Sequence, residues 1–308
     1  MADEVLVGTG GWMYFNIPAW DRLREYSKAY DFVEVNMTFY GDVPASLCHT
    51  LRKKVPENFI FTVKCSRFVT HVHGLRPVEE ASKAFEKMIG ICLILNAPLL
   101  VLEIPRSVRL DAERVMGFSS VDSKGVRVGV EVRGRADDSC YRTMQDMGII
   151  HVVDLSRGEP KHYDPELTYS RLFGRGRHNI YQFDDRELVE INSRAEKAPS
   201  TRVMLSFHGL KMYVDAARLK AYRMTGIMPP VIGNVGLESR VEVLAEDARF
   251  PATRDEIIAR QGWKLFDHQP NKENPSSRST KTHTQQKIPK PRRTKKNNIN
   301  NYSVKGVS

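Results

Sequence analysis

Apolar and polar residues alternate over residues 32–40, and this stretch organises the interpretation of the whole chain. The alternating side chains are the apolar Val33, Val35 and Met37 and the polar Glu34, Asn36 and Thr38. A period of two predicts a strand from Phe32 to Thr38. Helix-like segments lie on either side, which indicates a parallel strand covered by helices. Because the polar side of such a strand is buried, its carboxylate, amide and hydroxyl groups need partners or a function.

The same pattern continues as strands and helices in alternation. Seven further strands are expected at residues 5–10, 59–64, 99–104, 127–132, 149–154, 168–173 and 202–207. Helices are expected at residues 20–30, 44–54, 77–95, 111–118, 141–147, 185–197 and 215–224. Eight strands that alternate with helices predict an α/β protein with a (β/α)8 barrel of the TIM type. An open doubly wound sheet is the rival, but no glycine-rich phosphate fingerprint follows a strand.

We expect the barrel to span residues 1–245, and the composition of the chain changes sharply after it. Thr253 and Glu256 have the spacing of a capping box and Gly262 that of a helix stop. These signals predict a short helical appendage at 246–267. Residues 268–308 are rich in Asn, Ser, Thr, Gln, Lys and Pro and poor in apolar residues, which predicts a disordered tail.

Almost all of the net charge lies in this tail. The chain carries +10, and the tail holds ten Lys or Arg against the single acid Glu273, so the first 267 residues carry +1. Residues 287–296 would be attracted to any polyanion. A tether for DNA or RNA and an inert solubilising tail explain this composition equally well.

Nothing in the chain suggests a membrane or secretory protein. No run approaches the roughly 18 apolar residues of a membrane helix, and the acidic start at residues 1–4 leads directly into a strand, unlike a signal peptide. The four cysteines are far apart, which argues against a disulfide framework or a zinc knuckle. We therefore expect a cytoplasmic protein without a membrane partner.

Candidate chemistry gathers where the predicted strands end, because TIM-type barrels place their sites at that face. The polar and aromatic residues there are Trp12, Glu34, Asn36, Thr38, Tyr40, Lys64, Arg67, His71, Glu103, Glu131, Arg133, Asp154, Arg171 and His208. For any single one of these residues, a purely structural ion pair inside the barrel is as good an explanation as a functional role. Polar ends on so many strands exceed what packing requires. No Gly-x-Ser-x-Gly elbow, His-Glu-x-x-His motif or P-loop supports an esterase, zinc peptidase or kinase.

Four segments resemble the YecE-like family, also called domain of unknown function 72. They are Gly8–Tyr14, Val33–Tyr40, Phe59–Lys64 with Arg67 and Thr70-His71, and Val130–Arg133. The resemblance covers roughly residues 5–245 and implies a TIM-type barrel, in agreement with the strand count. It implies no settled mechanism. Some archaeal relatives are linked to cleavage of DNA at damaged pyrimidines, which places nucleic acid first among the substrates.

The chain departs from the family pattern at three strand ends. The seventh strand has Phe173 where the family commonly has His, and the eighth has Phe207-His208-Gly209 in place of Phe-Asn-Asn. Glu103 stands where the family has Gln. These departures indicate a subgroup with a different substrate, in which His208 and Glu103 compensate for the lost polar groups.

The leading hypothesis is a hydrolase or lyase, of the repair-endonuclease type, that acts on a phosphate-containing substrate such as nucleic acid. Its catalytic residues would be Glu34, Lys64, His71 and Glu131, with His71 as proton donor. Its substrate-binding residues would be Trp12, Asn36, Thr38, Tyr40, Arg67, Arg133, Arg171 and His208, the cations holding phosphate and the aromatic rings stacking on a base or sugar. If a divalent metal ion takes part, its candidate ligands are Glu34, Glu131 and Asp154.

Two other functions remain open at this stage. An enzyme or sensor for a small anionic metabolite, such as a sugar phosphate, suits a nearly neutral barrel with a cationic pocket. A non-catalytic adaptor would tether nucleic acid through the tail while the barrel binds a partner.

Overall fold

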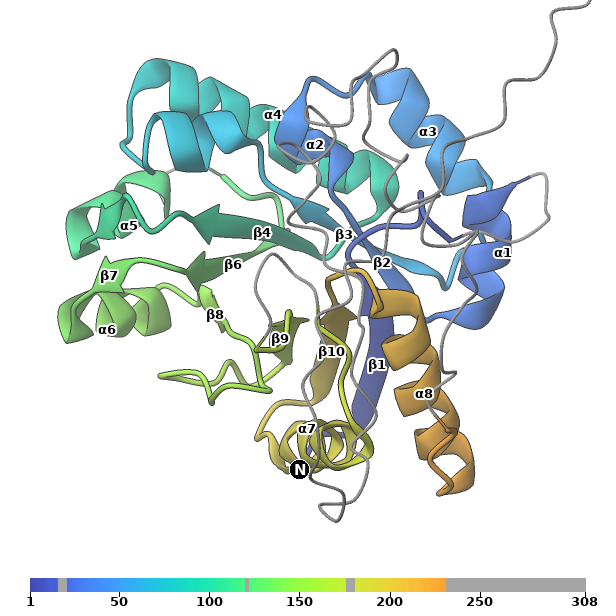
Figure 1. The fold of residues 1–308 in the computed structure, drawn as a ribbon. Coiled ribbons are helices and arrows are strands. Elements are labelled where there is room, and N and C mark those ends of the chain that lie inside the picture. Colours follow the sequence, from blue (N-terminus) through green and yellow to red (C-terminus); the bar gives the residue numbers. More distant parts are fainter. Residues whose placement is uncertain (16–20, 120–121, 176–180, 231–308) are drawn as a thin grey trace, which may run out of the picture. The chain divides into compact units, whose positions relative to one another are not determined.

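The computed structural model describes residues 1–15, 21–119, 122–175 and 181–230 (Figure 1). The predicted appendage at 246–267 and the predicted tail at 268–308 lie outside these ranges. Both remain predictions.

Eight parallel strands form one sheet in the order β8-β6-β4-β3-β2-β1-β10-β9. Their bounds are β1 Glu4–Thr9, β2 Phe32–Val35, β3 Ile60–Lys64, β4 Leu99–Ile104, β6 Arg127–Val132, β8 Ile150–Val152, β9 Leu167–Leu172 and β10 Arg202–Phe207. A separate pair, β5 (Arg109–Leu110) and β7 (Arg135–Ala136), lies in the loops that follow β4 and β6. The two end strands of the sheet meet where Val153 bridges to Ser170, and Arg171 N donates to Val153 O at 2.9 Å. The predicted (β/α)8 TIM-type barrel is thereby confirmed.

Helices connect the strands and cover the outside of the barrel (Figure 1). Their bounds are α1 Arg22–Ala29, α2 Met37–Tyr40, α3 Ala45–Lys53, α4 Glu79–Leu95, α5 Ala112–Ser119, α6 Asp138–Asp146, α7 Asp185–Lys197 and α8 Met212–Thr225, with a π-helical turn η1 at Phe68–Val72. Carboxylates start several of them. Asp137 accepts from Cys140 N at the start of α6, and Asp184 and Glu187 form a capping box at α7. None of the described helices is long and apolar enough to cross a membrane.

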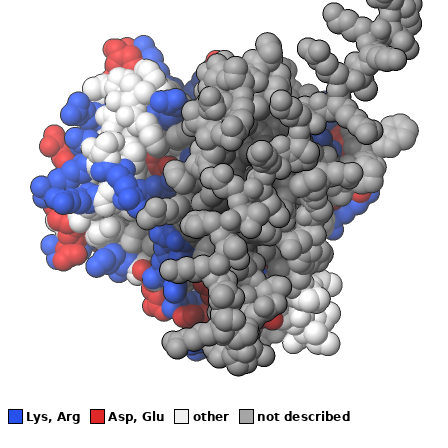
Figure 2. All heavy atoms as spheres, in the orientation of Figure 1, with Lys and Arg blue, Asp and Glu red and all other residues white. Residues whose placement is uncertain are grey.

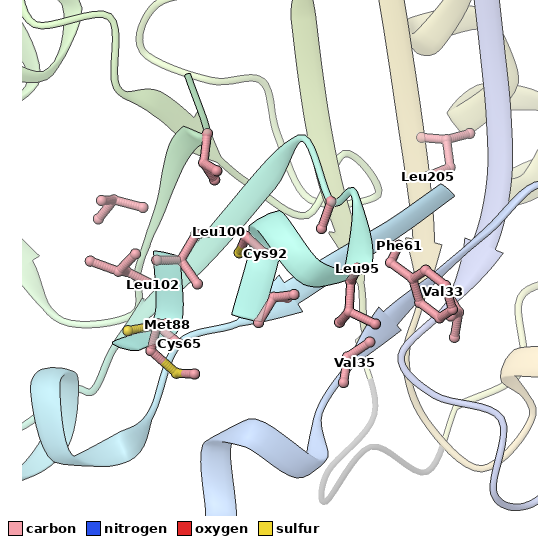
Figure 3. Close-up of a cluster of buried hydrophobic side chains, with 14 of the residues drawn as sticks. Val33, Val35, Phe61, Cys65, Met88, Cys92, Leu95, Leu100, Leu102 and Leu205 are labelled. Atoms are coloured by element: carbon pink, nitrogen blue, oxygen red, sulfur yellow. The ribbon is translucent and has the colours of Figure 1, made fainter. Parts of the chain in front are cut away.

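Alternate residues of each strand face the barrel interior or the helices. One buried cluster fills the interior with Phe32, Leu99, Val101, Ile150, Val152, Leu167, Tyr169 and Met204. The other parity faces outward, where Cys92 and Leu95 of α4 join Leu100 and Leu102 of β4 in the larger core (Figure 3). The interior parity ends in polar side chains at the C-terminal side of the strands, among them Glu34 two residues after Phe32 and Arg171 two residues after Tyr169. The apolar packing of the lower interior therefore supports a polar upper layer.

The strand predicted at 32–38 is wrong in its second half. β2 ends at Val35, Asn36 has helical backbone angles (φ −95°, ψ −16°), and α2 follows at once. The Thr38 hydroxyl donates to Val35 O at 3.0 Å and to Lys64 O at 2.6 Å. These bonds satisfy carbonyls at the ends of two neighbouring strands and hold the chain in a helical turn. Alternation beyond Val35 therefore reflects this turn and not a continued strand.

Candidate active site

The guanidinium of Arg171 is the centre of the polar layer. Its Nη2 and Nε atoms donate to the two oxygens of Glu34 at 3.0 and 3.1 Å, and its Nη1 donates to Glu103 Oε2 at 2.9 Å and to Glu131. Arg171 is 1% exposed and Glu34 is fully buried. Four strands thus contribute to one buried cluster, in which β9 supplies the cation and β2, β4 and β6 supply the carboxylates.

Glu103 joins this centre to a second, more exposed group of side chains. Lys64 Nζ lies 2.8 Å from Glu103 Oε2, Arg133 Nη1 lies 3.2 Å from Oε1, and His71 Nε2 lies 3.9 Å from the same oxygen. Arg133 also donates from Nε to Glu131 Oε1 at 2.9 Å, as their spacing of two residues predicts. The Arg133 side chain is 34% exposed and that of His71 26%, against 9% for Lys64. Arg133 and His71 are therefore the accessible members of the cluster.

Burial and charge fix the protonation of this group. Burial alone would raise the pKa of Glu103, but Arg171, Lys64 and Arg133 lower it to about 2. Burial lowers the pKa of Lys64, and the positive charge of Arg171 acts in the same direction. Burial also lowers the pKa of His71, although Glu103 opposes this. At neutral pH, Glu103 is therefore ionised and His71 neutral, so His71 is better suited to accept a proton than to donate one, the reverse of its predicted role.

His208 lies on the other side of Arg171, buried beside Glu34. Its Nε2 is 3.0 Å from Ser206 Oγ and 3.7 Å from Glu34 Oε2. Burial lowers its pKa well below the ordinary range, with Arg171, Lys64 and Arg133 adding to the effect. Gly10 makes room for this ring, because a Cβ at residue 10 would lie 2.2 Å from His208 Nδ1. The neutral ring is held by packing as much as by hydrogen bonds.

Two of the residues that depart from the family pattern, Phe173 and His208, are in contact. The ring of Phe173 stacks on that of His208, with centroids 4.7 Å apart and an interplanar angle of 24°. The guanidinium carbon of Arg133 lies 4.6 Å from the Phe173 centroid and that of Arg171 lies 5.2 Å from it. An aromatic ring at residue 173 therefore replaces hydrogen bonding by stacking on two cations and an imidazole.

Several residues of this cluster were not among the candidates. Tyr169 OH donates to Glu34 Oε2 at 2.9 Å and is 2.9 Å from Thr62 Oγ1, and Lys64 Nζ lies 3.9 Å from the ring centroid of Phe39. For the residues that lie on strands, their spacing from a candidate residue was a signal. Thr62, Tyr169 and Ser206 each precede a candidate by two residues and so share its face of the strand.

The rim residues divide into exposed and buried ones. Tyr40 is 75% exposed and Arg67 is exposed at the start of η1, whereas Trp12 is 6% exposed and belongs to the core. The Trp12 ring is therefore not exposed at the rim, and its stacking role stays a prediction. The Asn36 amide donates to Gly10 O at 2.5 Å, and the Thr38 hydroxyl is committed to backbone carbonyls. These two side chains shape the loops around the cluster.

The candidate metal ligands do not converge. Both oxygens of Glu34 accept hydrogen bonds from Arg171, and Glu131 pairs with Arg171 and Arg133. Asp154 lies in the loop after β8, where it accepts from Ser156 N at 2.9 Å and Phe173 N at 3.0 Å, and burial raises its pKa. Within the described ranges no three His, Cys, Asp or Glu side chains are arranged to hold a metal ion. The donor set as it stands does not fit a divalent cation.

Comparison with known proteins points to one family. The model of the family described as protein of unknown function DUF72 matches residues 6–228. A DUF72 family protein from Thermotoga maritima is 21% identical, with a TM-score of 0.57 over 72% of this chain and 99% of that one. A DUF72 family protein from Enterococcus faecalis is 16% identical, with a TM-score of 0.56 over 73% of this chain and 98% of that one. No curated protein matches the chain. At these identities the likeness to solved structures supports the fold.

Proposed function

This chain belongs to the DUF72 family, whose description assigns no activity, and we propose from its own side chains that it is a hydrolase or lyase acting on a phosphate-containing substrate, namely nucleic acid. One observation carries the proposal. Arg133, His71 and Lys64 surround the ionised carboxylate of Glu103 at the C-terminal ends of the strands, where barrel enzymes carry out their chemistry.

In a hydrolytic reaction each of these side chains has a distinct part. Arg133 and Lys64 hold two oxygens of a phosphodiester, and the neutral imidazole of His71 accepts a proton from the attacking water. The water oxygen bonds to phosphorus, the bond from phosphorus to the leaving oxygen breaks, and that oxygen takes a proton from the Lys64 ammonium. The lowered pKa of Lys64 makes it a better proton donor than an exposed lysine. Solvent then returns the proton from His71 to Lys64.

Arg171 and Glu34 act at one remove from the substrate. Both are buried, and all polar atoms of the Arg171 guanidinium donate to carboxylates. We therefore assign them as positioning residues that hold Glu103 and Glu131, in place of the direct phosphate contact expected for Arg171 from the sequence.

The surroundings of the cluster suit a nucleic-acid substrate. Tyr40 offers an exposed ring and Arg67 an exposed cation beside the site. The basic segment at 268–308 would raise the local concentration of DNA or RNA. We also propose a cytoplasmic location, with which the four free, buried cysteines, Cys48, Cys65, Cys92 and Cys140, are compatible.

The test is cleavage of end-labelled DNA, damaged and undamaged, with divalent metal and with chelator. Substituting His71→Gln should lower the rate by about 10² to 10⁴. His49→Gln, on the exposed face of α3, is the matched control and should leave the rate unchanged. Absence of both cleavage and binding of the intact chain under all these conditions would refute the proposal.

One observation favours a different substrate. Three cations, Lys64, Arg133 and Arg171, meet three carboxylates, so the centre has little net positive charge for a polyanion. An enzyme or sensor for a small anionic metabolite fits this balance. A thermal shift with sugar phosphates that survives deletion of residues 268–308, without DNA binding, would support it. An adaptor would keep its biological role after Glu131→Gln, whereas an enzyme would lose turnover.

A further inference from the structure

Three neighbouring loops at the C-terminal ends of β3, β4 and β6 are rich in arginine, and their acids, Asp111 and Asp137, stand only at the far ends of the second and third loops. Residues 65–78, 105–110 and 133–136 contain no Asp or Glu. Their six arginines are Arg67, Arg76, Arg106, Arg109, Arg133 and Arg135, and all six are exposed. The three strands are adjacent in the sheet, so the loops form one surface, which we call the arginine surface.

Backbone contacts hold the second and third of these loops together. β5 pairs in parallel with β7, and Arg133 N donates to Ile104 O at 3.0 Å. Gly134 permits this approach, because a Cβ there would lie 2.6 Å from Val108 O. The first loop joins them through Arg114, whose Nη1 donates to Gly74 O at 2.6 Å. The arginine surface is therefore a fixed structure and not a set of independent loops.

This pairing places two arginines opposite each other in the backbone register. Arg109 and Arg135 are register partners in the β5–β7 pair, and aligned residues of paired strands share a face. Leu110, the next residue of β5, is fully buried, so the arginines occupy the outer face. Like charges that share one face of a strand pair repel each other. A bound anion would remove that repulsion.

Within the described part of the chain, the acids at the ends of these loops have other partners, and Asp111 lies 3.4 Å from Arg114 Nε. Of the six arginines, Arg133 alone forms an ion pair with a carboxylate of the described part of the chain, through Glu103 and Glu131. Asp137 is close enough to Arg109 to feel its charge, but its carboxylate accepts hydrogen bonds from Ser139 Oγ at 2.6 Å and Cys140 N at 3.0 Å. Figure 2 shows Lys and Arg side chains gathered on the side of the molecule where Figure 1 places β7, α5 and α6, with fewer acids between them.

We propose that the arginine surface binds the phosphate backbone of a nucleic-acid strand and leads it to the cluster around Glu103. Arg133 belongs to both the surface and the cluster, so it connects the two. Several unpaired cations on one rigid surface suit a chain of phosphates better than a single anion, because each neutralised phosphate releases a counterion. Exposed Phe68 and Val72 beside Arg67 add an apolar contact for bases. This inference rests on the proposed function.

The experiment compares two variants of the full chain that lose the same charge. Arg109→Gln/Arg135→Gln removes two charges from the arginine surface. Lys53→Gln/Lys197→Gln removes two exposed charges from the last turns of α3 and α7, at the opposite end of the barrel. Fluorescence anisotropy with labelled single-stranded and duplex DNA is measured over a series of salt concentrations. Keeping the basic tail in every protein makes its contribution constant.

The arginine variant should weaken DNA binding at least tenfold at about 100 mM salt and reduce the slope of log K against log[salt] by about 1.5 to 2. The lysine variant should match the parent protein within about twofold. The melting temperature of the arginine variant should be equal or higher, since a repulsion is removed. Equal affinities for the two variants would overturn the inference, as would binding of an acidic polyglutamate peptide with the same dependence on Arg109 and Arg135.

A cleavage assay on the same proteins separates the two proposals. If the parent protein cleaves DNA and the arginine variant binds and cleaves equally well, the arginine surface is wrong and the proposed function stands. If the arginine variant loses binding while no protein cleaves, the surface stands and the hydrolase or lyase assignment is wrong.

Discussion

Arg171 and Glu34 meet across the barrel in a two-bond contact, with Nη2 3.0 Å from Oε1 and Nε 3.1 Å from Oε2. They come from β9 and β2, which have β1 and β10 between them in the sheet, and they are separated by 137 residues in sequence. Such a contact stabilises the fold only while both partners are present, because either one alone is an uncompensated buried charge.

Removing the arginine should therefore be costly. Arg171→Gln leaves Glu34 and two further carboxylates without their shared cation, and we expect the free energy of unfolding to fall by about 3–5 kcal/mol in urea titrations. Arg24→Gln, on the exposed side of α1, should change it by no more than about 0.5 kcal/mol. The double variant Arg171→Gln/Glu34→Gln should lose less than the sum of the two single variants. Strict additivity would contradict the coupling.

Glu103 should make stability depend on acid. Its pKa is lowered from 4.5 to about 2 in the folded protein, so its contribution is complete above about pH 4.5 and is lost as the pH falls through 2. The shift corresponds to about 3 kcal/mol. Glu103→Gln should be less stable than the parent protein at pH 7, and the difference should shrink between pH 4.5 and 2. Glu79→Gln, in an exposed pair with Lys83, serves as control and should show no such trend.

His208 should produce a second pH dependence in a higher window. Its folded pKa is lowered well below the ordinary 6.5, so the unfolded chain binds a proton that the folded protein does not. Stability should therefore fall as the pH drops below about 6.5, by up to about 1.4 kcal/mol per pH unit for this group. In His208→Gln that component disappears, whereas His49→Gln should retain it. Parallel stability curves for the parent and His208→Gln would argue against a buried neutral ring.

Gly10 and His208 predict a steric effect with a matched control. A Cβ at residue 10 would lie 2.2 Å from the His208 ring, so Gly10→Ala must displace it and should cost about 1–3 kcal/mol. A Cβ added at Gly41 would meet no atom within 4 Å, and the backbone there is extended with φ −163°. Gly41→Ala should be neutral or slightly stabilising, by at most about 1 kcal/mol. Thermal unfolding of both variants gives the comparison.

The fold followed from the sequence because the strand pattern is local. The fourth, fifth and eighth strands have the bounds expected from their apolar runs, at 99–104, 127–132 and 202–207. The second strand was overextended because three residues that alternate, Asn36 to Thr38, look the same in a strand and in a short turn. What decides between them is the bond from Thr38 to Lys64 O, a contact between distant segments.

The site was predictable in its members and not in its pairing. Alternation brings Glu131 and Arg133 together at the end of β6, and they do pair. The sequence assigns Glu34 no partner, and its hydrogen bonds come from Arg171 and Tyr169 on β9. Which strand lies opposite which across a barrel depends on closure and stagger, and these have no local signature.

The charged cluster also stabilises the closure of the barrel between β8 and β9. Backbone pairing there consists of the bridge between Val153 and Ser170. Among the described neighbouring strands of the barrel, this junction has the fewest paired residues. Arg171 lies next to that line on β9 and is fastened by its side chain to β2, β4 and β6. The ion pairs of Arg171 thus help to hold the barrel closed where backbone pairing is sparse. Replacing Glu34, Glu103 or Glu131 would therefore also remove an interaction that helps to close the barrel.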